Sequence, residues 1–320
     1  MLSAFMGSTL ADLLDVIDKG GPGRGRSSER TRMDVVSMVP EIFPDNTDRN
    51  RTSPFAFTGD RFEFRAIGSS ANAGSAMLFL NTAVAQQLKS FKVLVDKEIE
   101  KGEKLEDALM KIIRKFIRES RDIRFEGNGY SDEWHKEAAE RGLRGITDVP
   151  ASYDALLEEQ SIALMEEMCV MTRRELEARY EVRNQMYVKK LQIEARVLGD
   201  LTINHFVPAA IRHENMLLEN VKGLRDLFPP EEYQELVSTQ LKAIRIIAGY
   251  VNEMRGLVHL LIEARKKANN VELLHDRARE YAAAVLPVMD RIRDCADHLE
   301  MIVDDELWPL PKYRELLFLR

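Results

Sequence analysis

DNTDRNRTSPFAFTGDRFEFR, residues 45–65, is the stretch of this chain with the sharpest pattern. Two short apolar runs flank Gly59-Asp60, and a glycine that opens a two-residue loop is typical of a β-hairpin, because glycine tolerates a positive φ. With that loop, the alternation of side chains along a strand places four aromatic rings on one face. The pairs are Phe57 opposite Phe62 and Phe55 opposite Phe64. We expect this face to pack on a hydrophobic core.

The other face of the predicted hairpin carries Arg61, Glu63 and Arg65, with the small side chain of Ala56 across from Glu63. Arginines beside a glutamate on a stiff strand suit a site that handles phosphate and a divalent metal together. A plainer interpretation is a salt-bridged solvent face at the edge of a sheet. The pattern alone favours the plainer interpretation but does not exclude a site for phosphate and metal.

Three short motifs in and after this stretch resemble the active-site strand region of glutamine synthetases. They are Asn50-Arg51-Thr52, then Glu63-Phe64-Arg65, then Ala71-Asn72. The type III branch of that family is similar in two longer stretches. They are the sequence NRTSPFAFTG followed by FEFR, and FEGNGYSDEW at residues 125–134. The resemblance extends over the whole chain, although the long helices are much less specific than these motifs.

The resemblance implies the C-terminal portion of a type III glutamine synthetase. The fold would be mainly α with a small β-hairpin, with the C-terminal part of the α+β catalytic domain in residues 1–150 and a helical domain in residues 151–320. The activity would be ATP-dependent ligation of ammonia to glutamate through γ-glutamyl phosphate, in glutamine biosynthesis and nitrogen metabolism. The family uses Mg²⁺ or Mn²⁺ and works as a homo-oligomer of stacked rings.

By the same resemblance, four residues take roles in the site. Glu63 would be a metal ligand, since a hard cation prefers carboxylate oxygen. Arg65 would hold the substrate glutamate and its phosphorylated intermediate, and Arg51 would stabilise charge on the transferring phosphate. Arg61 would be a further phosphate contact. Many family members carry a second arginine where this chain has Ala56, so either another cation replaces it or the phosphate is held differently.

Most metal ligands of the family precede the segment found here. Only 62 residues precede Glu63, and they contain no histidine. One carboxylate does not hold two metals, and a two-stranded hairpin needs neighbouring strands. We therefore expect a truncated part of a longer polypeptide that has no synthetase activity alone. The alternative is a helical oligomerisation or scaffold protein, in which residues 152–320 act and the hairpin is vestigial.

Helices dominate the rest of the predicted fold. The expected elements are an amphipathic helix at 3–18, a short strand at 35–39, helices at 72–100 and 105–120, a helix from Ser131, and long antiparallel helices over 152–298. The longest covers 231–268, with an apolar stripe of Val237, Leu241, Ile244, Ile247, Val251, Met254, Val258 and Leu261. A second apolar stripe contains Ala282, Leu286, Met289, Ile292, Ala296, Leu299 and Ile302. Pro208 and Pro287 are expected to break or kink their helices.

Composition excludes several classes of protein. The net charge is −7, with 45% hydrophobic and 31% charged residues, so we expect no nucleic-acid partner. The start of the chain lacks a basic segment and carries Asp12, Asp15 and Asp18, which argues against secretion. No run of 18 apolar residues exists, so no membrane span is expected. These features predict a cytoplasmic protein.

The remaining candidate residues have plain interpretations. Cys169 and Cys295 are expected to be reduced core thiols. His135 is expected on a helix surface, since no second ligand has metal-site spacing. The methionines of residues 165–171 are expected to fill core, and Trp308 to pack its indole on the helical domain.

Overall fold

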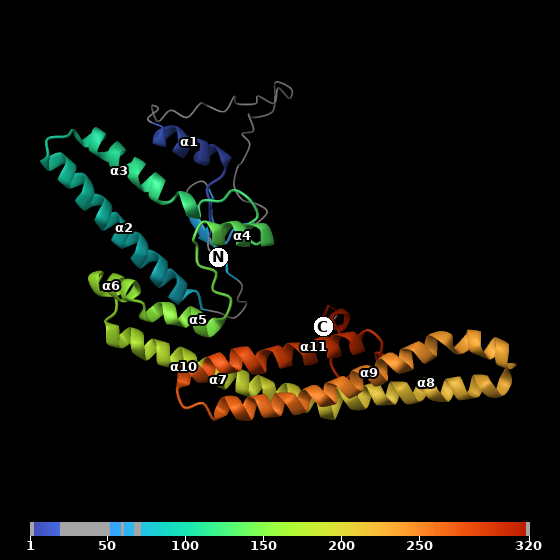
Figure 1. The fold of residues 1–320 in the computed structure, drawn as a ribbon. Coiled ribbons are helices and arrows are strands. Elements are labelled where there is room, and N and C mark those ends of the chain that lie inside the picture. Colours follow the sequence, from blue (N-terminus) through green and yellow to red (C-terminus); the bar gives the residue numbers. More distant parts are fainter. Residues whose placement is uncertain (1–2, 20–51, 59–60, 67–71, 318–320) are drawn as a thin grey trace, which may run out of the picture. The chain divides into compact units, whose positions relative to one another are not determined.

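The computed structural model describes residues 3–19, 52–58, 61–66 and 72–317 (Figure 1). These residues form two compact units. The N-terminal unit comprises Met1–Thr147 with Ala163–Met171, and the C-terminal unit comprises Asp148–Ile162 with Thr172–Arg320. The predicted strand at 35–39 lies outside the described residues. The predicted division at residue 150 into a catalytic and a helical domain stays a prediction.

The N-terminal unit contains a three-stranded sheet in the order β1 (Ala4–Phe5), β2 (Phe55–Phe57), β3 (Phe62–Phe64). Strands β2 and β3 pair antiparallel in the predicted register, with Ala56 opposite Glu63. Strand β1 pairs parallel with β2 and supplies the neighbour that the hairpin needs. The predicted helix at 3–18 is therefore wrong at its start, because α1 (Ser8–Asp18) begins only after this strand.

The phenylalanine face of the hairpin is only partly covered. Phe62 and Phe64 are 44% and 43% exposed, whereas Ala56 on the other face is fully buried. The rings cover one another instead: Phe55 stacks on Phe62 with centroids 4.9 Å apart, and Phe57 tilts against Phe62 at 5.3 Å. The prediction that this face packs on a hydrophobic core is thus wrong for the described chain.

Helices α2 (Gly74–Glu100) and α3 (Leu105–Glu119) confirm two predicted helices and lie side by side in Figure 1. Their shared core contains Val95, Ala108 and Ile112. A tight turn joins them, in which Gly102 has a φ of 94°, a conformation that glycine adopts without strain. After the short η1 (Arg121–Ile123), helix α4 (Asp132–Glu140) begins as predicted, with the Ser131 hydroxyl accepting from the Trp134 N–H.

Glu98 ties α2 to α3. Its side chain is only 11% exposed and binds Lys101 at 2.7 Å and also Lys111. The hydrogen bonds from Lys101 and Lys111 lower the pKa of this carboxyl to about 2. Because the folded pKa lies below the ordinary value, the resulting stabilisation is present above about pH 4.5 and is lost as the pH falls towards 2.

We expect Glu98→Gln to lower the thermal midpoint of the N-terminal unit at neutral pH. The difference from wild type should shrink as the pH falls from about 4.5 towards 2, because the wild-type carboxylate then becomes protonated. Thermal unfolding followed by circular dichroism over a pH series measures this difference. Asp96→Asn, which removes a 47% exposed carboxylate paired with Lys92, is the matched control and should have a smaller effect. A pH-independent difference for Glu98→Gln would contradict the assignment.

The C-terminal unit is a set of long helices that bury one core. Its long helices are α7 (Arg173–Leu201), α8 (Val207–Leu227), α9 (Pro230–Asn269) and α11 (Leu286–Glu300). The shorter elements are α5 (Val149–Asp154), η2 (Ala155–Leu157), α6 (Glu159–Glu167), which the division into units splits, α10 (Leu274–Glu280) and α12 (Tyr313–Leu316). Figure 1 shows α8 and α9 as an antiparallel pair. The predicted stripe of the longest helix is largely confirmed, with Ile247, Met254 and Leu261 at its buried centre.

Both predicted helix interruptions take the form of a widened turn. The π turn η3 (Thr202–Phe206) precedes Pro208, and η4 (Tyr281–Val285) precedes Pro287. The Val207 N–H donates to Thr202 O, five residues back. Proline lacks an N–H and its ring collides with the carbonyl four residues back, so a wider turn accommodates it without ending the helix. In the second stripe, Tyr281 and Val285 are fully buried, whereas the predicted Ala282 and Leu286 are only half-buried.

Three of the remaining predictions are confirmed and one is wrong. Trp308 is buried and stacks on Phe206 with centroids 5.3 Å apart. Met165 and Met171 are buried, Met168 is half-buried, and Cys295 is a buried free thiol. Cys169 is a free thiol but is exposed, because it occupies the turn after α6 at a φ of 54°. None of the helices in the described part of the chain is both long and apolar enough to cross a bilayer.

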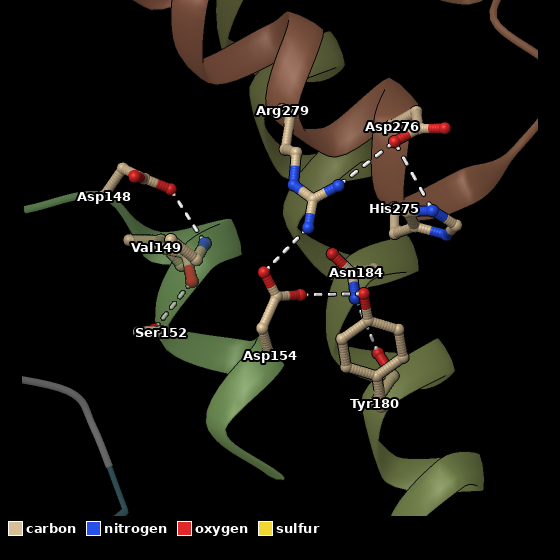
Figure 2. Close-up of polar contacts among 10 residues, drawn as sticks. Asp148, Val149, Ser152, Asp154, Tyr180, Asn184, His275, Asp276 and Arg279 are labelled. Carbon is tan, nitrogen blue, oxygen red and sulfur yellow. Dashed lines mark hydrogen bonds and ion pairs between the residues drawn. The ribbon is translucent and has the colours of Figure 1, made fainter. Parts of the chain in front are cut away.

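A polar cluster joins α5, α7 and α10 (Figure 2). Asp154 accepts from Tyr180 Oη at 2.9 Å and from Arg279 Nη2 at 2.8 Å, and Arg279 also pairs with Asp276 at 3.2 Å. Burial, and next the hydrogen bond to Asp154, raise the pKa of Tyr180 to about 12. The cluster therefore stabilises the neutral phenol and fixes α7 against its two neighbours.

We expect the phenol of Tyr180 to ionise well above the ordinary pKa of a tyrosine in an alkaline titration. Since its folded pKa is raised, its stabilisation is complete below about pH 10 and is lost as the pH rises towards 12. The measurement is the phenolate absorbance of wild type minus that of Tyr180→Phe. Asp154→Asn should move this transition to lower pH, because the carboxylate raises the pKa. A difference titration centred near the ordinary value would contradict the assignment.

Candidate functional site

Strand β3 brings three charged side chains to one face of the hairpin. Arg65 Nη2 lies 3.2 Å from Glu63 Oε2, and Arg61 Nη2 lies 3.6 Å from Glu63 Oε1. Because alternate residues of a strand share a face, the register of the hairpin is sufficient to place them together. Each carboxylate oxygen therefore faces one guanidinium, and the face carries a net positive charge suited to an anionic group.

The three side chains differ in exposure, and this difference separates their possible roles. The side chain of Arg61 is 66% exposed, that of Glu63 39%, and that of Arg65 17%. Arg65 is also fixed through its backbone, since its N–H donates to Pro54 O at 2.8 Å. A fixed, mostly covered guanidinium suits the orientation of a small substrate, whereas an exposed one suits a phosphate that approaches from solvent.

The segment before β2 is held by the loop at residues 125–131, which belongs to the motif FEGNGYSDEW. The Gly129 N–H donates to Thr52 O at 2.7 Å. Glu126 accepts from the N–H groups of Met6 at 3.1 Å and of Gly7 at 2.7 Å. Phe125 in turn stacks on Trp134 with centroids 4.1 Å apart. This loop was recognisable in the sequence as a motif, but its role was not. Its two glycines were the only sign that the backbone of the loop lies close to another segment.

The structure brings together three of the four predicted site residues, Arg61, Glu63 and Arg65. Arg51 lies outside the described residues. Ala56 is fully buried, so no cation stands opposite Glu63 at that position. His135 is exposed on α4, as predicted. The roles of these residues in catalysis and in cofactor binding stay predictions.

Glu63 does not form a metal site with its described neighbours. Within the described ranges, no group of three or more histidine, cysteine, aspartate or glutamate residues could hold an ion. A divalent cation takes six or more oxygen ligands, of which Glu63 would give at most two. Both of its oxygens also lie beside arginines. The described residues therefore do not fit a complete Mg²⁺ or Mn²⁺ site.

The model of the glutamine synthetase C-terminal domain matches residues 108–225. A glutamine synthetase of Bacteroides fragilis (strain YCH46) is 46% identical over 320 residues, which is 99% of this chain. Over nearly its whole length this chain is therefore similar to a glutamine synthetase.

Two further glutamine synthetases are similar over the same extent. The type-3 glutamine synthetase of Dictyostelium discoideum is 32% identical over 100% of this chain, and a glutamine synthetase of Butyrivibrio fibrisolvens is 28% identical over 99% of it. The chain spans 44%, 43% and 44% of the length of these three relatives. The resemblance to this family, and to part of such a protein, is confirmed.

Proposed function

We propose that this chain forms one wall of the active site of a glutamine synthetase, which ligates ammonia to glutamate with ATP through γ-glutamyl phosphate. The arrangement of Arg61 and Arg65 around Glu63 on one face of the hairpin supports this proposal. The whole enzyme would be a cytoplasmic homo-oligomer of stacked rings that binds glutamate, ammonia and ATP. Its metal would be Mg²⁺ or Mn²⁺.

The two described arginines would act by binding and orientation. Arg65 would bind the glutamate and its phosphorylated intermediate, because its backbone and its guanidinium are both fixed. Arg61 would contact phosphate oxygens from its exposed position. Arg51, from the motif Asn50-Arg51-Thr52, would stabilise the charge of the transferring phosphate. Glu63 would orient both arginines and give one carboxylate to a metal whose other ligands lie beyond the described residues.

A role of the helices in oligomer contacts has support of its own. Helix α7 exposes an apolar row at helical spacing, in which Val182, Met186, Ile193 and Val197 are 53%, 66%, 62% and 51% exposed. Exposed apolar rows of this kind mark interaction surfaces. The row favours subunit contacts in the proposed oligomer, and it equally supports the alternative of a helical scaffold protein.

A hybrid enzyme tests the proposed function. This chain would replace the matching segment of the Bacteroides fragilis glutamine synthetase, and glutamine formation from glutamate, ammonia and ATP would be measured. We expect the hybrid to make glutamine and Glu63→Gln to abolish most turnover, whereas Glu219→Gln, at an exposed position on α8, leaves it unchanged. If Glu63→Gln makes glutamine as fast as the unsubstituted hybrid, the proposed role of this face is wrong.

A further inference from the structure

Gly129 lies where no side chain fits. A Cβ at this position would lie 2.7 Å from Ser3 Oγ, 3.2 Å from Pro54 Cδ and 3.3 Å from Thr52 O. Ser3 is fully buried, so its hydroxyl has little space into which to move. The other two contacts belong to the segment that leads into β2. The closeness of these atoms requires glycine at position 129.

This segment leads directly to Arg65. The Gly129 N–H donates to Thr52 O at 2.7 Å, and two residues later Pro54 O accepts from the Arg65 N–H at 2.8 Å. Pro54 has no N–H and a restricted φ, so a displacement at Thr52 is passed on with little local adjustment. The loop thus reaches the backbone of the arginine proposed to bind glutamate through one stiff stretch of chain.

The loop is itself firmly held on its other side. Glu126 accepts from two consecutive N–H groups that lead into α1, and Phe125 stacks on the fully buried Trp134. Arg141 lies over the Trp134 ring at 5.1 Å and donates to Arg124 O at 3.0 Å. Because these contacts fix the loop, an added methyl group at Gly129 displaces the hairpin segment more readily than the loop.

We infer that Gly129 is a positioning residue for Arg65: its bare Cα and its N–H set the place of residues 52–54, and these residues set the place of the Arg65 backbone. The inference rests on the proposed function of Arg65. It assigns the motif FEGNGYSDEW a role in the geometry of the site. Gly129 contacts no substrate in this assignment.

The first measurement uses the 320-residue chain and needs no activity. Amide hydrogen exchange of Arg65 reports the bond to Pro54, and Gly129→Ala should speed it by about tenfold or more through local opening. Gly249→Ala on α9 is the matched control, because an added Cβ there meets nothing within 4 Å. That control should leave the exchange of Arg65 unchanged. Unchanged exchange in Gly129→Ala would overturn the inference.

The second measurement uses the hybrid synthetase. Gly129→Ala should lower kcat/KM for glutamate by about 10- to 100-fold, since a displacement of the order of 1 Å is this costly to an oriented group. The KM for ATP should change little, and a purely structural defect would not give this split. Equal kcat/KM values for Gly129→Ala and the unsubstituted hybrid would overturn the inference. If Arg65→Gln leaves turnover intact, the proposed function of Arg65 is wrong. The hydrogen exchange of Arg65 still tests the positioning by Gly129 in that case, because it does not depend on activity.

A second substitution tests whether the effect of Gly129→Ala reaches Arg65 through residues 52–54 or through Ser3. Ser3→Ala removes the atom nearest to the added methyl group but leaves the contacts with Pro54 and Thr52. We expect Gly129→Ala/Ser3→Ala to keep the fast exchange of Arg65 and the loss in kcat/KM. Full recovery of both by Ser3→Ala would show that the effect passes through Ser3, and the assigned path would be wrong.

Discussion

Arg65→Gln should lower kcat/KM for glutamate in the hybrid synthetase by about 10²- to 10³-fold, as expected when one preorganised charged donor is removed from a developing anion. Glutamine keeps an amide NH₂ donor near the site but loses the positive charge and the forked set of guanidinium donors. Arg65 is the most covered of the three charged residues, with 17% of its side chain exposed, so water replaces it poorly. Steady-state kinetics with varied glutamate measures the loss.

Two variants make this result specific. Arg65→Lys keeps the charge but not the planar fork, and it should recover only part of the loss. Arg293→Gln removes a 76% exposed arginine on α11 and should leave kcat/KM unchanged. If Arg65→Gln behaves like Arg293→Gln, the arginine does not bind substrate, and the hairpin face is the plain salt-bridged surface that its pattern also allowed.

Trp134→Ala should destabilise the N-terminal unit by about 3–5 kcal/mol, the usual cost of removing a large buried aromatic ring. Trp134 is fully buried, stacks on Phe125 at an interplanar angle of 17° and carries Arg141 on its ring. Its loss leaves a cavity under the loop that holds β1 and the hairpin. Urea unfolding followed by circular dichroism measures the change in the free energy of unfolding.

Trp134→Phe is the matched control for this prediction. It keeps an aromatic ring against Phe125 and removes Nε1, a buried donor for which the described structure provides no acceptor. Its cost should therefore be well below that of alanine. A loss of less than about 1 kcal/mol for Trp134→Ala would mean that the loop is held mainly by its hydrogen bonds.

The hairpin was predictable from sequence because its information is local. The Gly59-Asp60 dipeptide of the sequence predicts the pairing, and the pairing decides which side chains meet Glu63. The helices at 72–100 and 105–120 were predictable for the same reason, since their apolar spacing and their polar turn are adjacent in the chain.

The support of the site was not predictable, because its contacts join distant segments. Glu126 binds backbone groups 119 and 120 residues earlier, and no spacing in the sequence relates them. The start of α1 was misjudged for this reason, since residues 4 and 5 pair with β2 and with Arg124 in place of forming a helical turn. The exposure of the phenylalanine face was also not predictable. The alternation of aromatic and polar residues is the same whether the rings pack on a core or on one another.

The two π turns add one residue each to a helix, and one residue corresponds to a rotation of about 100° around the axis. The wide turn takes up this extra residue, so the parts of the helix on either side keep one buried face although its numbering is offset by one residue. A stripe counted backwards from Met289 reaches Leu286 and Ala282, although the fully buried positions are Val285 and Tyr281, one residue earlier. Without the wide turn, the extra residue would rotate the buried face beyond it by about 100°, so the width of these turns is as strongly constrained as the composition of the core.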